Sequence, residues 1–292
     1  MAAGRSAQER AGDRAVLWAS IGSAPAVVFV GLFVAGGLFS LFLVSFWQVR
    51  NFDIEALWTL DNYLVVGTDY LGVVTWTLFV AGVVSVLTVV LAVPFAYVAT
   101  FKAGARREVL VLLILITIFS GYLVKVYAMK TILGSDGLIN SLLRAFGLIQ
   151  EPLPFLIYSP PAVILALTNT LVPLAVLPIF SALQNVPYSL VEASKDLGAG
   201  RWRTFLNVTL PLGRTGIVTA FAIAFILSAG DFVTPALLGG PSGLMVGQVV
   251  ASRFGVAFDW PVGSALAFVT VALALLVIGL VNWLSRLVLD RQ

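Results

Sequence analysis

The sequence predicts an all-α, polytopic membrane protein with six transmembrane helices. Of its 292 residues, 60% are hydrophobic and only 11% are charged, and the mean hydropathy of +1.03 lies well beyond that of soluble domains. A spanning helix needs about 20 mostly apolar residues. Six segments meet that length, at residues 24–47, 73–99, 108–128, 160–183, 215–237 and 263–286.

Positive charge is distributed unevenly over the connections between these segments. Because Lys and Arg near a span tend to stay in the cytoplasm, the richer set of connections marks the inner side, which then contains both termini. The richer set is Arg5, Arg10, Arg14, Lys102, Arg106, Arg107, Lys195, Arg201, Arg203, Arg214, Arg286 and Arg291, and the poorer set is Arg50, Lys125, Lys130, Arg144 and Arg253. Residues 1–22 are expected to be a retained cytoplasmic segment, since the apolar run after them is far longer than a signal-peptide core of roughly 7–15 residues.

The absent residue types exclude several functions. Without Cys or His, the chain cannot build the usual zinc, haem or iron–sulfur site or a Ser-His triad. It also has no GxxxxGK[ST] run for binding nucleotide phosphates. We therefore expect no catalytic residue, metal or cofactor in this chain. Nucleic-acid binding is not expected either, because no basic patch is interleaved with stacking aromatic residues.

The first span and the loop after it, 23–66, form one predicted unit. Gly31, Gly36 and Gly37 permit close helix approach in the span. The loop is acidic, with Asp53, Glu55, Asp61 and Asp69 against Arg50. Two interpretations stay open for this loop: it lies on the membrane surface through its aromatic residues, or it contacts an external protein.

Polar residues inside three spans are candidates for a transport pathway. Lys125 near the outer end of the third span either faces a pathway or extends to the interface. Thr168, Asn169 and Thr170 lie at mid-depth in the fourth span and must face protein or a water-filled route. Hydrogen bonding between helices is the alternative to a pathway role for these three residues.

The fifth span contains an acid beside helix-breaking residues, in the run from Ser228 to Pro235. Asp231 lies 16 residues after Thr215, about 24 Å at the helical rise, and thus in the outer part of the bilayer core. An interrupted helix beside an acid is typical of polar sites in carriers, so Asp231 and Thr234 are candidate pathway residues. The alternative is that the carboxylate simply reaches headgroup water.

The most polar inner connection, 188–211, is predicted to be a helix-turn-helix. Its two amphipathic pieces are Tyr188 to Leu197 and Trp202 to Val208, with Gly198 and Gly200 allowing a bend at positive φ and Pro211 ending the second piece. A bilayer does not need apolar side chains at these positions, so we expect a protein surface to cover them. They are Leu190, Val191, Leu197, Trp202 and Phe205.

This connection resembles the EAA signature of ABC importer permeases, with one substitution, since Ser194 stands where the second Ala is usual. The matching positions are Glu192, Ala193, Gly198, Val208, Leu210 and Pro211. The resemblance implies the type I ABC importer permease fold over 67–287 and a coupling helix that docks on a separate ATPase. The residues it implies for coupling are Glu192, Ala193, Ser194, Asp196, Leu197, Gly198 and Arg201.

Further motifs resemble the spermidine/putrescine permease group. They are Leu60-Asp61-Asn62-Tyr63, Leu123-Val124-Lys125-Val126-Tyr127, Gly230 to Pro235, Leu238-Gly239-Gly240, Asp259-Trp260-Pro261 and Gly263-Ser264-Ala265. This resemblance implies polyamine import across the bacterial inner membrane, with this chain in contact with membrane lipid. Its protein partners would be a second permease subunit, two ATP-binding subunits and an extracytoplasmic solute-binding protein. The alternatives are an importer of the same type for iron, thiamine or an opine, and an ion-gradient-driven secondary transporter.

Overall fold

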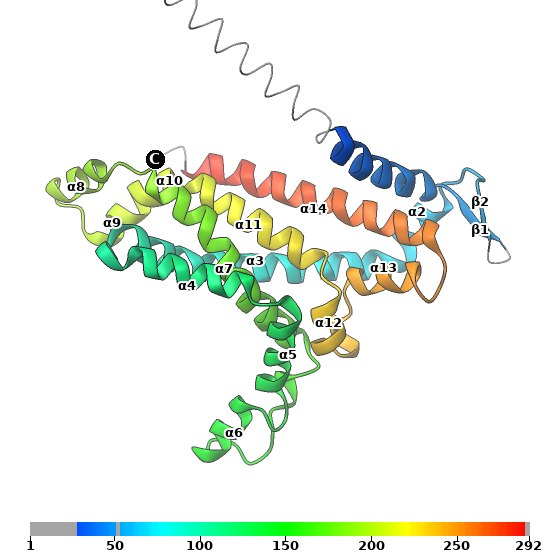
Figure 1. The fold of residues 1–292 in the computed structure, drawn as a ribbon, viewed down its shortest axis with the longest axis horizontal. Coiled ribbons are helices and arrows are strands. Elements are labelled where there is room, and N and C mark those ends of the chain that lie inside the picture. Colours follow the sequence, from blue (N-terminus) through cyan, green and yellow to red (C-terminus); the bar gives the residue numbers. More distant parts are fainter. Residues whose placement is uncertain (1–27, 51–52, 290–292) are drawn as a thin grey trace, which may run out of the picture.

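The computed structural model describes residues 28–50 and 53–289, which are almost entirely helical (Figure 1). A helix at Val28–Val44 comes first. The α-helices that follow are α2 Asp61–Val65, α3 Leu71–Phe101, α4 Arg107–Phe119, α5 Tyr122–Leu133, α6 Leu138–Ala145, α7 Pro160–Gln184, α8 Tyr188–Asp196, α9 Arg201–Thr204, α10 Leu210–Leu212, α11 Arg214–Ala229, α12 Val233–Leu238, α13 Val246–Phe254 and α14 Trp260–Leu289. Single 3-10 turns lie at Gly104–Arg106, Pro154–Leu156 and Pro241–Gly243, and π-helical turns at Val66–Tyr70 and Phe205–Thr209.

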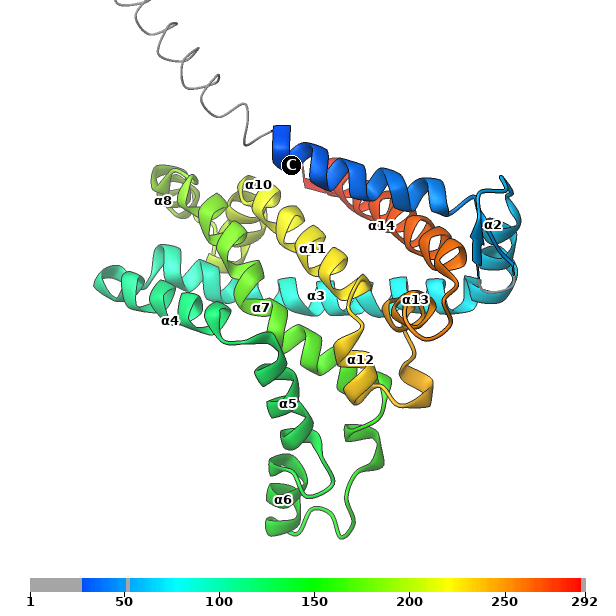
Figure 2. The ribbon, with the colours of Figure 1, turned by 45° about the vertical axis from the view of Figure 1, so that its right-hand side comes forward.

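The core forms where α3, α7 and α11 pack on one another. Two clusters of buried side chains fill the contact, one around Val84, Leu167 and Leu238 and the other around Ala96 and Ile179. Alanines such as Ala96, Ala166 and Ala220 lie among the larger Val, Leu and Ile side chains of these clusters. Their small size allows the close backbone approach by which helices associate in a bilayer. The helix α14 packs beside α11 and α13 and completes the bundle (Figure 2).

Three helices in the described part of the chain are long and apolar enough to cross a membrane alone: Asp61–Phe101, Pro160–Gln184 and Trp260–Val288. The number rises to five if each of two bent helix pairs counts as one span, and Val28–Val44 is a shorter apolar helix. The predicted second, fourth and sixth spans are thus confirmed as helices. The total of six stays a prediction.

The predicted third span is wrong as a continuous helix. The chain is extended at Ser120 and Gly121, with ψ near 130° at both, and the helices on either side are bent by 90°. Figure 1 shows α5 and α6 projecting away from the long helices. Hydropathy does not report this break, because both halves are apolar and Ser and Gly fit a spanning segment.

The predicted fifth span also ends early. Helix α11 stops at Ala229, and Gly230 to Phe232 separate it from α12. The break follows from the sequence GDF, in which Gly lowers helix stability and Asp begins a new helix more readily than it continues one.

The basic connections gather at one end of the bundle. Helices α8, α9 and α10, the α3–α4 connection and the C-terminal end of α14 lie at one end of the bundle, on the left of Figure 1. This end contains Lys102, Arg106, Arg107, Lys195, Arg201, Arg203, Arg214 and Arg286. The opposite end contains α2, α13 and the two strands, so the charge asymmetry predicted along the chain is an asymmetry in space.

A small hairpin that sequence patterns do not predict follows the first helix. Strand β1 (Gln48–Arg50) pairs antiparallel with β2 (Asp53–Glu55). The buried Asn62 anchors it by donating hydrogen bonds to the carbonyl oxygens of Ser45 (2.8 Å) and Trp47 (2.7 Å). The hydroxyl of Ser45 also lies 2.8 Å from that of Tyr63. The first helix is thereby fixed to α2.

Candidate functional site

The turn of the candidate coupling loop depends on one residue, Gly198, whose backbone has the left-handed conformation with positive φ. Helix α8 ends in a Schellman motif, in which Gly198 N–H donates to the Lys195 carbonyl (2.8 Å) and Ala199 N–H donates to that of Ser194 (3.0 Å). Gly198 has φ of +82°, which only glycine adopts without strain. The expectation for Gly200 is wrong, because its φ of −65° suits any residue.

The predicted coupling residues mostly face outward from α8. Glu192, Ala193, Asp196 and Leu197 are exposed, and Leu197 is 89% exposed. Ser194 is half-buried, and its hydroxyl lies 3.1 Å from that of Thr204 on α9. This contact holds the two helices of the loop together, and sequence reasoning missed Thr204 because no local pattern pairs it with Ser194.

The apolar residues of the loop divide into two sets. Leu190, Leu197 and Trp202 are exposed, as expected of a surface that another protein covers. Val191 is buried within the chain itself, so the expectation that it needs an external partner is wrong. Phe205 is half-buried and packs on Tyr97 and on the exposed Trp202.

A groove of about 500 Å³ lies between α8 and the helical segment 205–212. It is lined by Leu190, Ala193, Ser194, Leu197, Ala199, Asn207, Val208, Pro211 and Leu212. Most of these side chains are small or apolar, so the groove accepts a complementary apolar projection. Arg201 lies outside it and lines a different cavity, next to Lys102.

The prediction that Pro211 ends the second piece is wrong. Helical structure continues from Arg201 through Leu212, and Pro211 lies in the first turn of α10. A π-helical turn at Phe205–Thr209 precedes the proline. This wider turn relieves the clash that proline makes with the carbonyl four residues before it in a regular α-helix.

The candidate pathway residues Asp231 and Thr234 meet at the break between α11 and α12. The Asp231 carboxylate accepts hydrogen bonds from the N–H groups of Val233 (3.1 Å) and Thr234 (3.2 Å), so it caps α12. The buried Thr234 has its hydroxyl 2.7 Å from that of Tyr122, the first residue of α5. The two helix breaks, at 120–121 and 230–232, are therefore joined by a hydrogen bond across 112 residues of sequence.

Asn169 is not part of this cluster. It is exposed on α7, and no hydrogen bond among the described residues joins it to Asp231 or Thr234. Its neighbours Thr168 and Thr170 are buried, and Thr170 donates to the Ala166 carbonyl of its own helix (2.9 Å). The alternative of hydrogen bonds between helices is therefore not observed for these three residues in the described part of the chain.

Comparison with known proteins identifies this arrangement. Residues 25–290 match the family described as binding-protein-dependent transport system inner membrane component. The chain belongs to this family. It is therefore a transmembrane permease subunit of a bacterial ABC importer, as the loop resemblance implied, and the EAA loop at 188–211 is characteristic of its family.

Relatives of this permease include named transport proteins. It is 32% identical over 221 residues to the spermidine/putrescine transport system permease protein PotB of Haemophilus influenzae, covering 75% of this chain and 77% of that one. It is 29% identical over 240 residues to PotB of Escherichia coli, covering 82% and 86%. It is also 29% identical over 283 residues to the inner membrane ABC transporter permease protein YdcU of Escherichia coli, covering 89% and 87%.

The fold of the permease is also found in a solved structure. A chain of a bacterial ABC transporter involved in the import of the acidic polysaccharide alginate superposes with a TM-score of 0.69, covering 97% of this chain and 99% of that chain at 17% identity. At this identity the likeness shows the fold alone. It confirms the ABC importer permease fold, and the domain bounds of 67–287 stay a prediction.

Proposed function

We propose that this permease moves a polyamine across the inner membrane. The observation that carries the proposal is the similarity to PotB over most of both chains. The Asp231 carboxylate, which caps α12 at the helix break, favours a cationic solute, because it is an acid within an otherwise apolar segment. The secondary-transporter alternative is set aside by family membership. Import of another solute is the remaining alternative.

In the proposed assembly, the permease pairs with a second permease subunit and works with two ATP-binding subunits and an extracytoplasmic solute-binding protein. The exposed face of α8 and the groove beside it are the proposed contact with an ATP-binding subunit. Both termini are proposed to be cytoplasmic. Arg5, Arg10 and Arg14 precede the first span, and the C-terminal end of α14 shares one end of the bundle with the basic connections (Figure 1). ATP hydrolysis then belongs to a partner, and this chain transmits the resulting motion.

The solute is tested by measuring ATP hydrolysis of the purified complex in lipid. Its binding protein is loaded in turn with putrescine, spermidine, ferric ion or an unrelated amino acid. We expect stimulation by a polyamine only. Stimulation by ferric ion alone would be consistent with an ABC importer but would overturn the assignment of a polyamine as its solute.

Replacing Asp231 by asparagine tests the pathway role. Asparagine keeps one acceptor oxygen for the first N–H groups of α12. We therefore expect the fold to persist while polyamine uptake falls about ten-fold, the loss typical of one charge-assisted contact. Asp69→Asn is the matched control, because Asp69 is also acidic and is exposed on the turn before α3. Equal uptake by the two variants would assign Asp231 to capping alone.

A further inference from the structure

An amphipathic cavity lies between α3 and the segment that joins the coupling loop to α11. Its volume is about 650 Å³, within the range of small-molecule sites. Nine apolar side chains line it: Val89, Val90, Val93, Pro94, Val98, Trp202, Phe205, Leu210 and Ile217. Tyr97, Lys102 and Arg201 complete the lining. The cavity is therefore lined mostly by apolar side chains and also carries positive charge.

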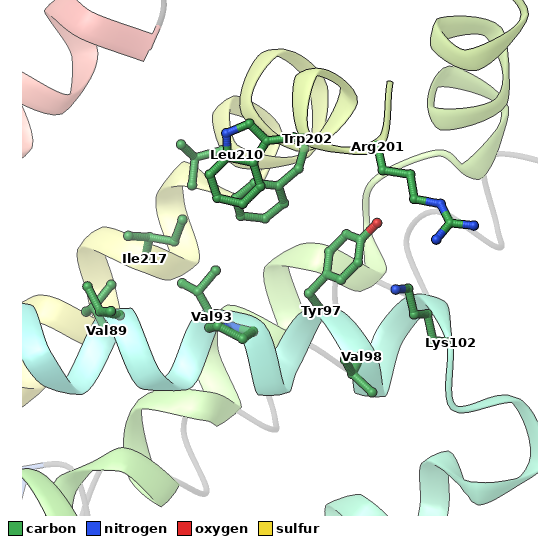
Figure 3. A pocket seen from close by; sticks show the side chains of 12 residues that line it. Val89, Val93, Tyr97, Val98, Lys102, Arg201, Trp202, Leu210 and Ile217 are labelled. Carbon is green, nitrogen blue, oxygen red and sulfur yellow. The ribbon is translucent and has the colours of Figure 1, made fainter. Parts of the chain in front are cut away.

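Both cations lie at the same end of the cavity. Figure 3 shows Lys102 and Arg201 beside the Tyr97 hydroxyl, with Val89 and Ile217 at the far end. The Lys102 ammonium lies 5.8 Å from the centre of the Tyr97 ring. In the described part of the chain, neither cation forms an ion pair with a carboxylate. Two positive charges thus lie at one end of an apolar space without an acidic partner among the described residues.

The surroundings of the cavity match a lipid-facing position at the basic end of the bundle. Val90 is 58% exposed and Val98 is 43% exposed on α3, and neighbouring exposed positions of that helix are also apolar. A second cavity shares Tyr97, Lys102 and Arg201 and adds Lys195 to the basic rim. Basic pockets between transmembrane helices at the cytoplasmic side are suited to anionic lipid headgroups.

We propose that this cavity binds one anionic phospholipid, with an acyl chain along the apolar wall and the phosphate at Lys102 and Arg201. Because Arg201 and Trp202 begin α9, the bound lipid would contact the coupling loop directly. The inference depends on the membrane location of the chain and not on its solute. It also gives Arg201 a role different from the predicted contact with an ATPase.

Lipid retention by the purified transporter tests the site. The complex, extracted with its partner subunits, is equilibrated with equal amounts of phosphatidylglycerol and phosphatidylcholine, and retained lipids are counted by native mass spectrometry. We expect preferential retention of phosphatidylglycerol. Lys102→Glu is expected to weaken that retention by at least about five-fold, the typical effect of one cation near an anionic membrane surface.

Lys130→Glu is the matched control, since the Lys130 ammonium also lies 5.8 Å from a tyrosine ring centre, that of Tyr158, but on α5 away from the cavity. Val93→Trp fills the apolar part and is expected to lower retention without changing charge. Equal retention of both lipids by the unmodified complex would overturn the proposal without any variant. Equal effects of Lys102→Glu and Lys130→Glu would also overturn it. So would disulfide or bifunctional cross-linking of a Val93→Cys variant to a partner subunit's helix, since the chain has no other cysteine.

Discussion

Replacing Gly198 by valine is expected to reduce solute-stimulated ATP hydrolysis about thirty-fold while the permease still inserts and assembles. The φ of +82° at this position costs a β-branched residue about 2 kcal/mol, which corresponds to roughly that loss in the population of the native turn. The Schellman motif that ends α8 would open, and the exposed face of α8 would lose its fixed direction. The measurement is ATPase activity of the reconstituted complex with and without loaded binding protein.

The matched control is Gly200→Val in the same loop. Neither glycine has any atom within 4 Å of the place where a Cβ would stand, so the two substitutions differ in backbone conformation and not in crowding. Because Gly200 has φ of −65° and ψ of 160°, valine fits there without strain. Near-normal coupling in Gly198→Val, or equal loss in both variants, would count against a role for the left-handed turn.

Replacing Gly216 by alanine is expected to destabilise the permease by about 1–3 kcal/mol, the usual cost of overpacking. A Cβ there would lie 2.4 Å from the Pro178 carbonyl oxygen and 2.5 Å from the Ala182 Cβ. Helices α7 and α11 would have to separate, which opens the core on the side nearest the coupling loop. The midpoint of thermal unfolding of the detergent-solubilised complex measures the effect.

Gly279→Ala provides the comparison, because Gly279 lies in α14 and a Cβ added there would have no atom within 4 Å. Alanine also has a higher helix propensity than glycine. We therefore expect the thermal midpoint of Gly279→Ala to equal or exceed that of the unmodified complex. If the thermal midpoint of Gly216→Ala equals that of the unmodified complex, α7 and α11 can move apart at little cost in free energy, which contradicts the prediction.

Helix boundaries were predictable where the sequence carries explicit stop and start signals. Helix α7 begins at Pro160, as predicted, because Pro160 and Pro161 suit the first turn and the hydroxyl of Ser159 accepts a hydrogen bond from Ala162 N–H (3.3 Å). The loop at 188–211 was predictable as a helix-turn-helix for similar reasons. Hydropathy failed where the helix axis changes direction but the side chains on both sides of the bend are equally apolar, as at Ser120 and Gly121.

The candidate site was only partly predictable because its contacts join distant segments. Asp231 was predictable from its charge inside an apolar segment. Its use as a helix cap became visible only with the backbone, and the link from Thr234 to Tyr122 spans 112 residues. No periodicity or motif relates two such positions. The same reason explains why the Ser194–Thr204 contact and the three-residue strands were not predicted.

The right-angled break between α4 and α5 has a consequence for the permeability barrier. Helix α4 has 13 residues, about 20 Å of rise, which is shorter than the roughly 30 Å hydrocarbon layer. Ser120 and Gly121 are exposed in this chain, yet non-helical backbone at membrane depth persists only where protein buries it or water reaches it. The break therefore either lies against a neighbouring chain or lines a water-filled space. In the first case the permeability barrier at this point depends on that chain staying in contact with Ser120 and Gly121.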